Sequence, residues 1–241
     1  MKLPNIAGII KRRILVNYRV VPEVIQPLLP PKFRPKLQAD FAIAGICLIR
    51  LEQIRPKGIP SFLGTSSENA AHRIAVVWED EHGKTQEGVY IWRRDTDSRL
   101  NQTAGGRFFP GEYHPAKFNV KDDGNHVDFE MLSKDESVKI LVRGSHSEEL
   151  PRKSSFGNAT AASAFFESGS LGYSATQKGD RVEGMRLHTT QWKVSPLEVE
   201  HVYSSFFDDK TKFPSDSACF DCALIMRDIE HEWHGEPNLY L

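Results

Sequence analysis

Basic and aromatic residues alternate along one predicted strand, where together they could bind an organic acid. Over residues 182–194, side chains two apart share a face of the strand, which groups Arg186, His188 and Trp192. Guanidinium and imidazole N–H groups donate well to a carboxylate. If the apolar residues of the other face pack beneath a helix outside the sheet, this basic face lines the interior. The alternative is that Arg186 and His188 face solvent, as most charged residues do.

A second basic cluster, RRDTDSR, occupies residues 93–99, where a predicted strand ends and a helix over residues 95–102 begins. Backbone N–H groups at a helix N-terminus, together with Arg93 and its neighbour, could hold a carboxylate or a phosphate. The alternative is a structural network, which the sequence favours because acidic residues at a helix start are stabilising on their own. Its members would be Arg94, Asp95, Asp97 and Arg99.

Three further residues are candidates for catalysis, namely Lys117, Glu68 and His72. Glu68 and His72 could form an acid–base pair if residues 67–73 are helical, because residues four apart then share a face. The favoured alternative for this stretch is a polar loop. Lys117 begins a predicted strand, where a desolvated lysine could lose its proton and attack a carbonyl. Strand alternation places it opposite the apolar Phe118, which favours an outward position.

No metal site, reactive C-x-x-C motif or cofactor is predicted. His231 and His234 are three residues apart and lack the spacing of the H-E-x-x-H metal motif. Cys219 and Cys222 form a C-x-x-C, but the apolar residues after it indicate a buried strand and inert thiols. An odd count of three cysteines argues against a disulfide framework and favours a reducing, cytoplasmic location. The sequence contains no phosphate-loop, dinucleotide or nucleophile-elbow motif.

These residues would be positioned mainly by strands. Apolar alternation bounded by turn residues predicts about nine strands, at residues 13–20, 41–51, 74–78, 87–93, 116–121, 126–132, 138–143, 182–194 and 222–229. Short turns such as DDGN at 122–125 imply antiparallel neighbours, and so large a sheet tends to curl and close. Helices are few, at residues 22–26, 95–102, 159–167 and 197–207. The predicted fold is mainly β, a closed antiparallel barrel with a few covering helices.

Length and charge limit the classes of function that the chain could have. The chain has 241 residues, and no repeat or linker divides it, so one domain over residues 1–241 is predicted. Its 31 basic and 32 acidic residues leave a net charge of -1, which gives no bulk attraction to nucleic acid or to an anionic membrane. No apolar run approaches the roughly 20 residues of a membrane helix, and no signal peptide is predicted. The oligomeric state stays open, a homo-oligomer included.

Several stretches resemble the uncharacterised bacterial YqjF-like family of the acetoacetate decarboxylase-like superfamily. They span almost the whole chain and read ILVNYRV at 14–20, LLPPKF at 28–33, SENAAHR at 67–73, RRDTDSRL at 93–100 and HEWH at 231–234. The resemblance implies a closed antiparallel β-barrel with a central small-molecule cavity. Acetoacetate decarboxylase uses a Schiff-base lysine beside a second lysine, in a Pro-Lys-Lys stretch. The corresponding residues here are Pro115, Ala116 and Lys117, with a single lysine.

The sequence thus predicts a barrel that binds a small acidic organic compound, and the predicted ligand contacts are Arg186, His188, Trp192 and Arg93. One alternative is a Schiff-base lyase or hydratase acting on a β-keto acid or related carbonyl. In that reaction Lys117 would be the nucleophile, with Glu68 or His72 in proton transfer. Another alternative is a protein-interaction module, although no long amphipathic surface helix supports it. Whether the chain is an enzyme stays open at this point.

Overall fold

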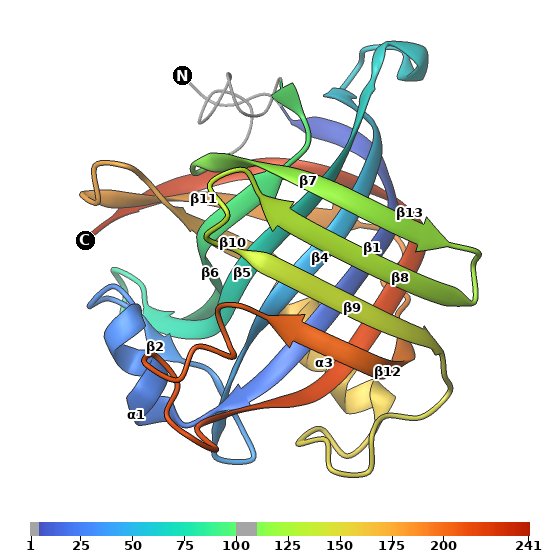
Figure 1. The fold of residues 1–241 in the computed structure, drawn as a ribbon. Coiled ribbons are helices and arrows are strands. Elements are labelled where there is room, and N and C mark those ends of the chain that lie inside the picture. The colour runs from blue at the N-terminus through green and yellow to red at the C-terminus, as the bar shows by residue number, and fades with distance from the viewer. Residues whose placement is uncertain (1–4, 100–109) are drawn as a thin grey trace.

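The computed structural model describes residues 5–99 and 110–241, and its main feature is one 13-stranded sheet (Figure 1). The strands are β1 (Ile6–Val20), β2 (Arg34–Pro35), β3 (Leu37–Gln38), β4 (Phe41–Pro56), β5 (Thr65–Glu79), β6 (Thr85–Thr96), β7 (Tyr113–Asp122), β8 (His126–Ser133), β9 (Lys139–His146), β10 (Leu171–Ala175), β11 (Arg181–Thr189), β12 (Ser195–Ser204) and β13 (Ala218–Tyr240). The helical segments are α1 (Pro22–Ile25), η1 (Gln26–Leu28), η2 (Ser61–Leu63) and α3 (Ala159–Ser168). Within the two described ranges, no helix has the length and apolar character needed to cross a membrane.

Nine of the strands close into a ring, which we call the large ring. Its order is β1–β4–β5–β6–β7–β8–β9–β12–β13 and back to β1. Neighbouring strands are antiparallel except β6 and β7, which run parallel where residues 94–96 pair with 113–115. In Figure 1, β7, β8 and β9 form one wall, and the long strands β1, β4 and β5 cross behind it. Closure pairs the edges that an open sheet would expose. The predicted mainly β, closed-barrel fold class is confirmed.

A second ring shares five strands with the first, and we call it the small ring. β10 pairs with β6 in parallel, and β11 joins β10 to the far end of β13. The strands β6–β10–β11–β13–β1–β4–β5 therefore also close on themselves. β6 can serve both rings because it changes partner along its length, from β10 at residues 89–91 to β7 at residues 94–96.

Two of the shared strands, β1 and β4, are buried on both faces over part of their length, at residues 14–18 and 42–49. β4 contains a continuous buried run, AIAGICLI at residues 42–49, which is typical of strands that are covered on both sides. In β1, Val16 belongs to the core cluster of the large ring, which includes Phe129 of β8. The preceding residue, Leu15, points to the opposite face and belongs to the core cluster of the small ring, which includes Phe166 of α3. Alternation along one strand thus fills two separate interiors.

Two predicted helices are confirmed. α1 has Pro22 at its first position, as expected for a residue without a backbone N–H. α3 begins after Asn158, whose side-chain Oδ1 accepts a hydrogen bond from the Ala161 backbone N–H at 2.9 Å. This cap satisfies one of the free donors of the first helical turn. α3 then packs Phe166 against the small-ring interior.

Two other helix predictions are corrected by the structure. The predicted helix over residues 197–207 is wrong, because this stretch belongs to β12 as far as Ser204 and pairs with β9. Pro196 explains the error, since a proline is acceptable near the start of a strand as well as in a first helical turn. The predicted helix over residues 95–102 starts too early, because Asp95 and Thr96 end β6. Residues 100–102 lie outside the described part of the chain.

Candidate functional site

The interior of the small ring contains a cavity of about 110 Å³, which we call the arginine cavity. Every strand of that ring contributes to its wall, as do Gly169 and Ser170 just after α3. Its apolar side chains include Ile10, Ile49, Leu51, Val89, Ile91, Met185, Leu187 and Trp233. Its polar side chains are Arg13, Cys47, Asn69, Arg73, Arg94, Tyr113 and Ser170. The lining residues that the structure describes include three arginines but no aspartate, glutamate or lysine.

A bulge in β1 aims Arg13 at this cavity. The pairing of β1 with β4 skips Lys11, so that Ile10 and Arg13, three residues apart, line the same cavity. Regular alternation would point two such residues to opposite faces. Arg13 then lies beside Ile49 of β4, and Asn69 of β5 lies beside Ile49 on its other side.

The neighbouring row of the sheet brings in the other polar residues. Cys47 of β4 and Arg94 of β6 flank Ala71 of β5. Arg73 lies two residues beyond Ala71, on the same face of β5 and beside Gly45 of β4. Because Ala71 carries only a methyl group, it leaves the space between these polar groups open. Three guanidinium groups from β1, β5 and β6 therefore reach one cavity.

Arg73 is the most deeply buried of the three arginines, with 2% of its surface exposed. Its Nη2 donates a hydrogen bond to Asn17 Oδ1 at 2.6 Å, and its guanidinium carbon lies 4.9 Å from the centre of the Phe166 ring. Its Nε and Nη1 are buried and have no hydrogen-bond partner among the described residues. Burial lowers the pKa of Arg73 to about 10, so the side chain stays charged at neutral pH.

Arg13 and Arg94 are held mainly by neutral partners. Arg13 Nε donates to the Cys47 thiol, with 3.2 Å between nitrogen and sulfur, and its Nη1 is buried without a partner in the described chain. Arg94 donates from Nη2 and Nε to Ser174 Oγ, at 2.9 and 3.2 Å. Neither arginine, nor Arg73, forms an ion pair with a carboxylate of residues 5–99 or 110–241. The cavity is thus cationic, with free N–H donors and apolar walls.

Arg186 and His188 lie on the opposite face of β11 from the cavity. Met185 and Leu187 line the cavity instead, so the predicted inward orientation of the basic face is reversed. The reason is the small ring, which closes around the apolar face of β11. Arg186 Nε forms an ion pair with Glu236 at 2.8 Å, and the exposed His188 ring packs 4.2 Å from that of His234.

Trp192 lies near the arginine cavity without lining it. Its Nε1 donates to Ser163 Oγ of α3 at 3.2 Å, and the Arg13 guanidinium carbon lies 5.8 Å from its ring centre. The Trp192 ring therefore lies beside the Arg13 guanidinium, at a position that does not line the cavity, and helps to position it. Of the four predicted ligand contacts, it is the one that touches an arginine of the cavity.

Arg93 belongs to a structural ion-pair cluster outside the cavity. Its Nη2 contacts Asp95 Oδ1 at 2.9 Å and Asp135 Oδ1 at 3.3 Å. The predicted network grouped Arg94 and Arg99 with Asp95 and Asp97, but strand alternation sends Arg94 to the cavity and Arg93 to the face of Asp95. Asp97 Oδ1 accepts the Glu68 backbone N–H at 2.9 Å and forms no ion pair among the described residues.

Glu68 and His72 both lie on β5, because residues 67–73 form part of a strand and not the favoured polar loop. They share a face but lie about 13 Å apart at the usual strand rise, too far for direct proton transfer. His72 is 1% exposed, and its ring packs 5.4 Å from Trp92 and 5.6 Å from Phe206. Burial, and next the charge of Arg93, lowers the pKa of His72 to about 3.

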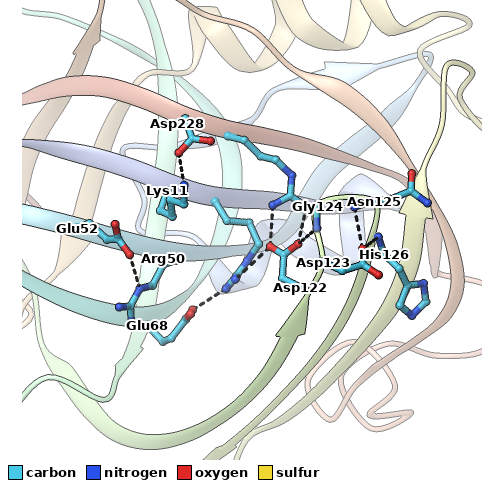
Figure 2. Close-up of polar contacts among 12 residues, drawn as sticks. Lys11, Arg50, Glu52, Glu68, Asp122, Asp123, Gly124, Asn125, His126 and Asp228 are labelled. Atoms are coloured by element: carbon cyan, nitrogen blue, oxygen red, sulfur yellow. Dashed lines mark hydrogen bonds and ion pairs between the residues drawn. The ribbon is translucent and has the colours of Figure 1, made fainter.

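Glu68 takes part in a salt-bridge network that ties β1, β5, β7 and β13 together (Figure 2). Its Oε2 contacts Arg12 Nη2 at 2.7 Å, and Arg12 Nη1 lies 3.6 Å from Asp122 Oδ2. Asp122 also binds Arg227, at 2.7 Å. Burial raises the pKa of Glu68, while Arg12 opposes that shift. The charges of this network are balanced within the protein, in contrast to those of the arginine cavity.

Lys117 is exposed on β7, while its neighbours Ala116 and Phe118 pack against the large-ring core. The favoured outward position is therefore the one observed. In the described residues, no group of three or more histidine, cysteine or acidic side chains could hold a metal ion. The C-x-x-C motif lies on β13, where Cys222 is fully buried and burial raises its pKa to about 12.

The comparisons with known proteins identify a family and a fold. Residues 10–221 match a family model described as "Uncharacterized conserved protein (COG2071)". No curated protein matches the sequence at a significant level. Acetoacetate decarboxylase from Legionella pneumophila aligns with a TM-score of 0.62 and 10% identity, over 97% of this chain and 87% of its own.

Two further solved structures have the same fold. An acetoacetate decarboxylase-like enzyme from Sphingomonas wittichii RW1 aligns with a TM-score of 0.61 and 13% identity, over 100% of this chain and 93% of its own. The enduracididine biosynthesis enzyme MppR, complexed with pyruvate, aligns with a TM-score of 0.56 and 12% identity, over 100% and 91%. At these identities the likeness concerns the fold alone.

Proposed function

We propose that this chain, which belongs to the DUF2071 family, binds a small organic carboxylate in the arginine cavity. The observation that carries the proposal is an imbalance of charge. Arg13, Arg73 and Arg94 line one cavity, and none has an acidic partner among the described residues. A buried cation is unfavourable unless a counter-charge joins it. A carboxylate supplies that charge and accepts guanidinium hydrogen bonds, often two from one arginine.

The size and walls of the cavity limit the ligand further. A volume of about 110 Å³ lies below the roughly 300–1,000 Å³ of pockets for drug-sized molecules, which favours a compound of a few carbon atoms. Leu187, Met185 and Ile91 on the walls favour a short apolar portion beside the acid group. Asn69 Oδ1 is buried without a donor in the described chain and could accept a hydrogen bond from a ligand hydroxyl.

Two fold relatives support a small oxo acid as the ligand class. MppR has been solved with pyruvate, and the Legionella match is an acetoacetate decarboxylase. Pyruvate and acetoacetate both combine one carboxylate with one carbonyl group. We extend this ligand class to the present chain. The narrower YqjF-like assignment made from the sequence stays a prediction, and it points to no particular substrate.

The proposal is tested by calorimetric and thermal-shift titrations with pyruvate, acetoacetate and acetate. The neutral amide of pyruvate serves as a control of nearly the same shape. Binding to the folded state raises the melting temperature as the ligand concentration rises. We expect this from the acids and not from the amide. An amide that binds as tightly as pyruvate would contradict recognition of the carboxylate.

Variants locate the binding site. Replacing Arg94 with glutamine, Arg94→Gln, should weaken the binding of pyruvate about tenfold to a hundredfold, the usual worth of a hydrogen bond to a charged group. The matched control is Arg186→Gln, because Arg186 pairs with Glu236 away from the cavity. The Arg186→Gln variant should bind pyruvate with the same affinity as the unmodified protein. Equal losses in both variants, or no binding of any acid, would overturn the proposal.

A further inference from the structure

We propose that Cys47 is a nucleophilic thiol of the arginine cavity, placed to attack the carbonyl carbon of a bound 2-oxo acid. This inference rests on the proposed function and deepens it, because it assigns a reacting group to the same site. Cys47 lies on β4, lines the cavity and is 8% exposed. Of the chain's three cysteines, all within the described residues, Cys47 alone lines the cavity.

Two arginines line the cavity on either side of Cys47's strand, and one of them contacts its sulfur atom. Arg13 Nε donates a hydrogen bond to it, at 3.2 Å. Arg73, on the neighbouring strand β5, faces the same cavity, where its position lies diagonal to that of Cys47. Cationic neighbours stabilise negative charge on sulfur, and the thiolate is the reactive form of cysteine. The thiol thus lies in the electropositive surroundings that nucleophilic cysteines require.

A second observation shows that a ligand belongs beside this thiol. Arg73 is 98% buried and lines the cavity, yet its Nε and Nη1 have no partner in the described chain. A carboxylate that satisfies these two nitrogens lies next to Cys47, because both residues face the cavity from adjoining strands. In a 2-oxo acid the carbonyl carbon is bonded directly to the carboxylate carbon. The electrophilic atom therefore comes within reach of sulfur when the acid group is held by arginine.

The proposed step is a balanced addition that consumes no oxidant or reductant. The sulfur–carbon bond forms while the carbonyl π bond opens, and that electron pair moves to the carbonyl oxygen. The thiol proton ends on this oxygen, which gives a thiohemiketal. Guanidinium N–H groups stabilise the negative charge that develops on the oxygen during the attack. Reversal of the step releases the intact oxo acid and the free thiol.

The other two cysteines provide internal controls. Cys222 is fully buried away from the cavity, and burial raises its pKa to about 12. Cys219 is partly exposed, and its thiol lies 3.8 Å from the Asp216 carbonyl oxygen. A Cys219→Ser variant therefore leaves Cys47 as the single cysteine open to a small reagent in the folded protein. This variant is the background for the experiments below.

The experiment compares iodoacetate with its neutral analogue iodoacetamide. Iodoacetate is a small carboxylate whose reactive carbon is bonded to the acid group, as in a 2-oxo acid. Alkylation forms a sulfur–carbon bond, releases iodide and gives up the thiol proton to water. Intact mass and peptide mapping follow the reaction at Cys47. We expect iodoacetate to react faster by about tenfold or more, because arginine hydrogen bonds concentrate the charged reagent at the site.

Two variants test the source of this preference. Arg13→Gln should remove most of the difference between the two reagents, and saturating pyruvate should protect Cys47 from both. Arg186→Gln should leave the preference unchanged. If the native protein resists both reagents until it is unfolded, or if iodoacetate shows no advantage, the inference is overturned.

A direct measurement separates this inference from the proposed function. Pyruvate with an NMR-active label at its carbonyl carbon should show a tetrahedral-carbon signal in the protein and none in Cys47→Ser. Pyruvate that binds by calorimetry without this signal would refute the nucleophile and leave the binding site standing. If no carboxylate binds at all, the proposed function is wrong. Cys47 should then react with iodoacetate no faster than with iodoacetamide.

Discussion

Arg73 and Asn17 form a buried pair between β5 and β1, in which Arg73 Nη2 donates to Asn17 Oδ1 at 2.6 Å. Asn17 is itself fully buried, and its Nδ2 donates to the Leu15 carbonyl oxygen at 3.0 Å. The amide therefore fixes the orientation of the guanidinium without neutralising it. A carboxylate in the place of Asn17 would cancel the charge, but it would also remove the attraction for an anionic ligand.

Removing the charge of Arg73 should abolish ligand binding while preserving the fold. In Arg73→Met, Asn17 loses its partner, at a cost of about 1–3 kcal/mol. The same substitution removes an uncompensated buried charge, which stabilises the folded state by a similar amount. We expect the free energy of unfolding in urea to change by less than about 2 kcal/mol, and pyruvate binding to disappear. A large loss of stability, with binding retained in the folded fraction, would show instead that Arg73 is a structural residue.

The coupling between Arg73 and Asn17 is measurable in a double-mutant cycle. Asn17→Ala leaves the Arg73 guanidinium without its acceptor and should lower the free energy of unfolding by about 1–3 kcal/mol. In the Arg73→Met background the same substitution should cost clearly less, because the interaction is already gone. Urea unfolding of the four proteins gives the coupling energy. Additive effects would mean that the 2.6 Å contact contributes nothing to stability.

Stability should fall in mild acid because His72 is buried in its neutral form. Its pKa in the folded protein is lowered to about 3, from 6.5 in an unfolded chain. Between these values the unfolded state binds a proton that the folded state does not. The contribution of His72 is thus complete above pH 6.5 and is lost as the pH falls toward 3. The free energy of unfolding should fall by up to about 1.4 kcal/mol per pH unit.

The measurement for His72 is a difference between variants. Burial raises the pKa values of Glu68 and Asp95. These two carboxyl groups therefore make the folded state more stable as the pH falls, which is opposite to the effect of His72. The slope of stability against pH in the unmodified protein is therefore compared with that of His72→Phe, which keeps a ring between Trp92 and Phe206. The variant should show the flatter slope. His201→Ala, at an exposed histidine of β12, is the control, and a slope that changes there but not in His72→Phe would contradict the assignment.

Local signals in the sequence predicted much of the fold. The turn after β7 is an example, because Gly124 supplies a positive φ of 97°. The Asp122 side chain accepts the Gly124 backbone N–H, and the Asp123 side chain accepts that of His126. The cap at Asn158 is another. The small ring was not predicted, because the pairing of β11 with β13 joins residues about fifty positions apart and leaves no mark in the local pattern.

The candidate site was harder to predict for a related reason. Arg13 stands in a run of basic residues, KRR at 11–13, and only the bulge beside Lys11 turns it toward the cavity. Arg73 carried the clearest signal, a single charge between AA at 70–71 and IAVV at 74–77. A charged residue within a strand that is apolar on both faces has no route to solvent. Such a position indicates a buried partner or a ligand, whereas the alternation along β11 gave no equivalent evidence for Arg186.

Lys117 should form no Schiff base with pyruvate or acetoacetate. This chemistry requires an uncharged amine in a largely dry site, facing a carbonyl carbon. Lys117 is exposed on the outer face of β7, and the inward position beside it is occupied by Ala116. Borohydride treatment with either oxo acid should therefore modify Lys117 no more than Lys121, which is exposed on the same strand and serves as the control. Peptide mass mapping compares the two sites. A selective adduct at Lys117 that disappears in Lys117→Gln would restore the lyase mechanism, and it would also require β7 to rearrange so that the amine reaches an interior.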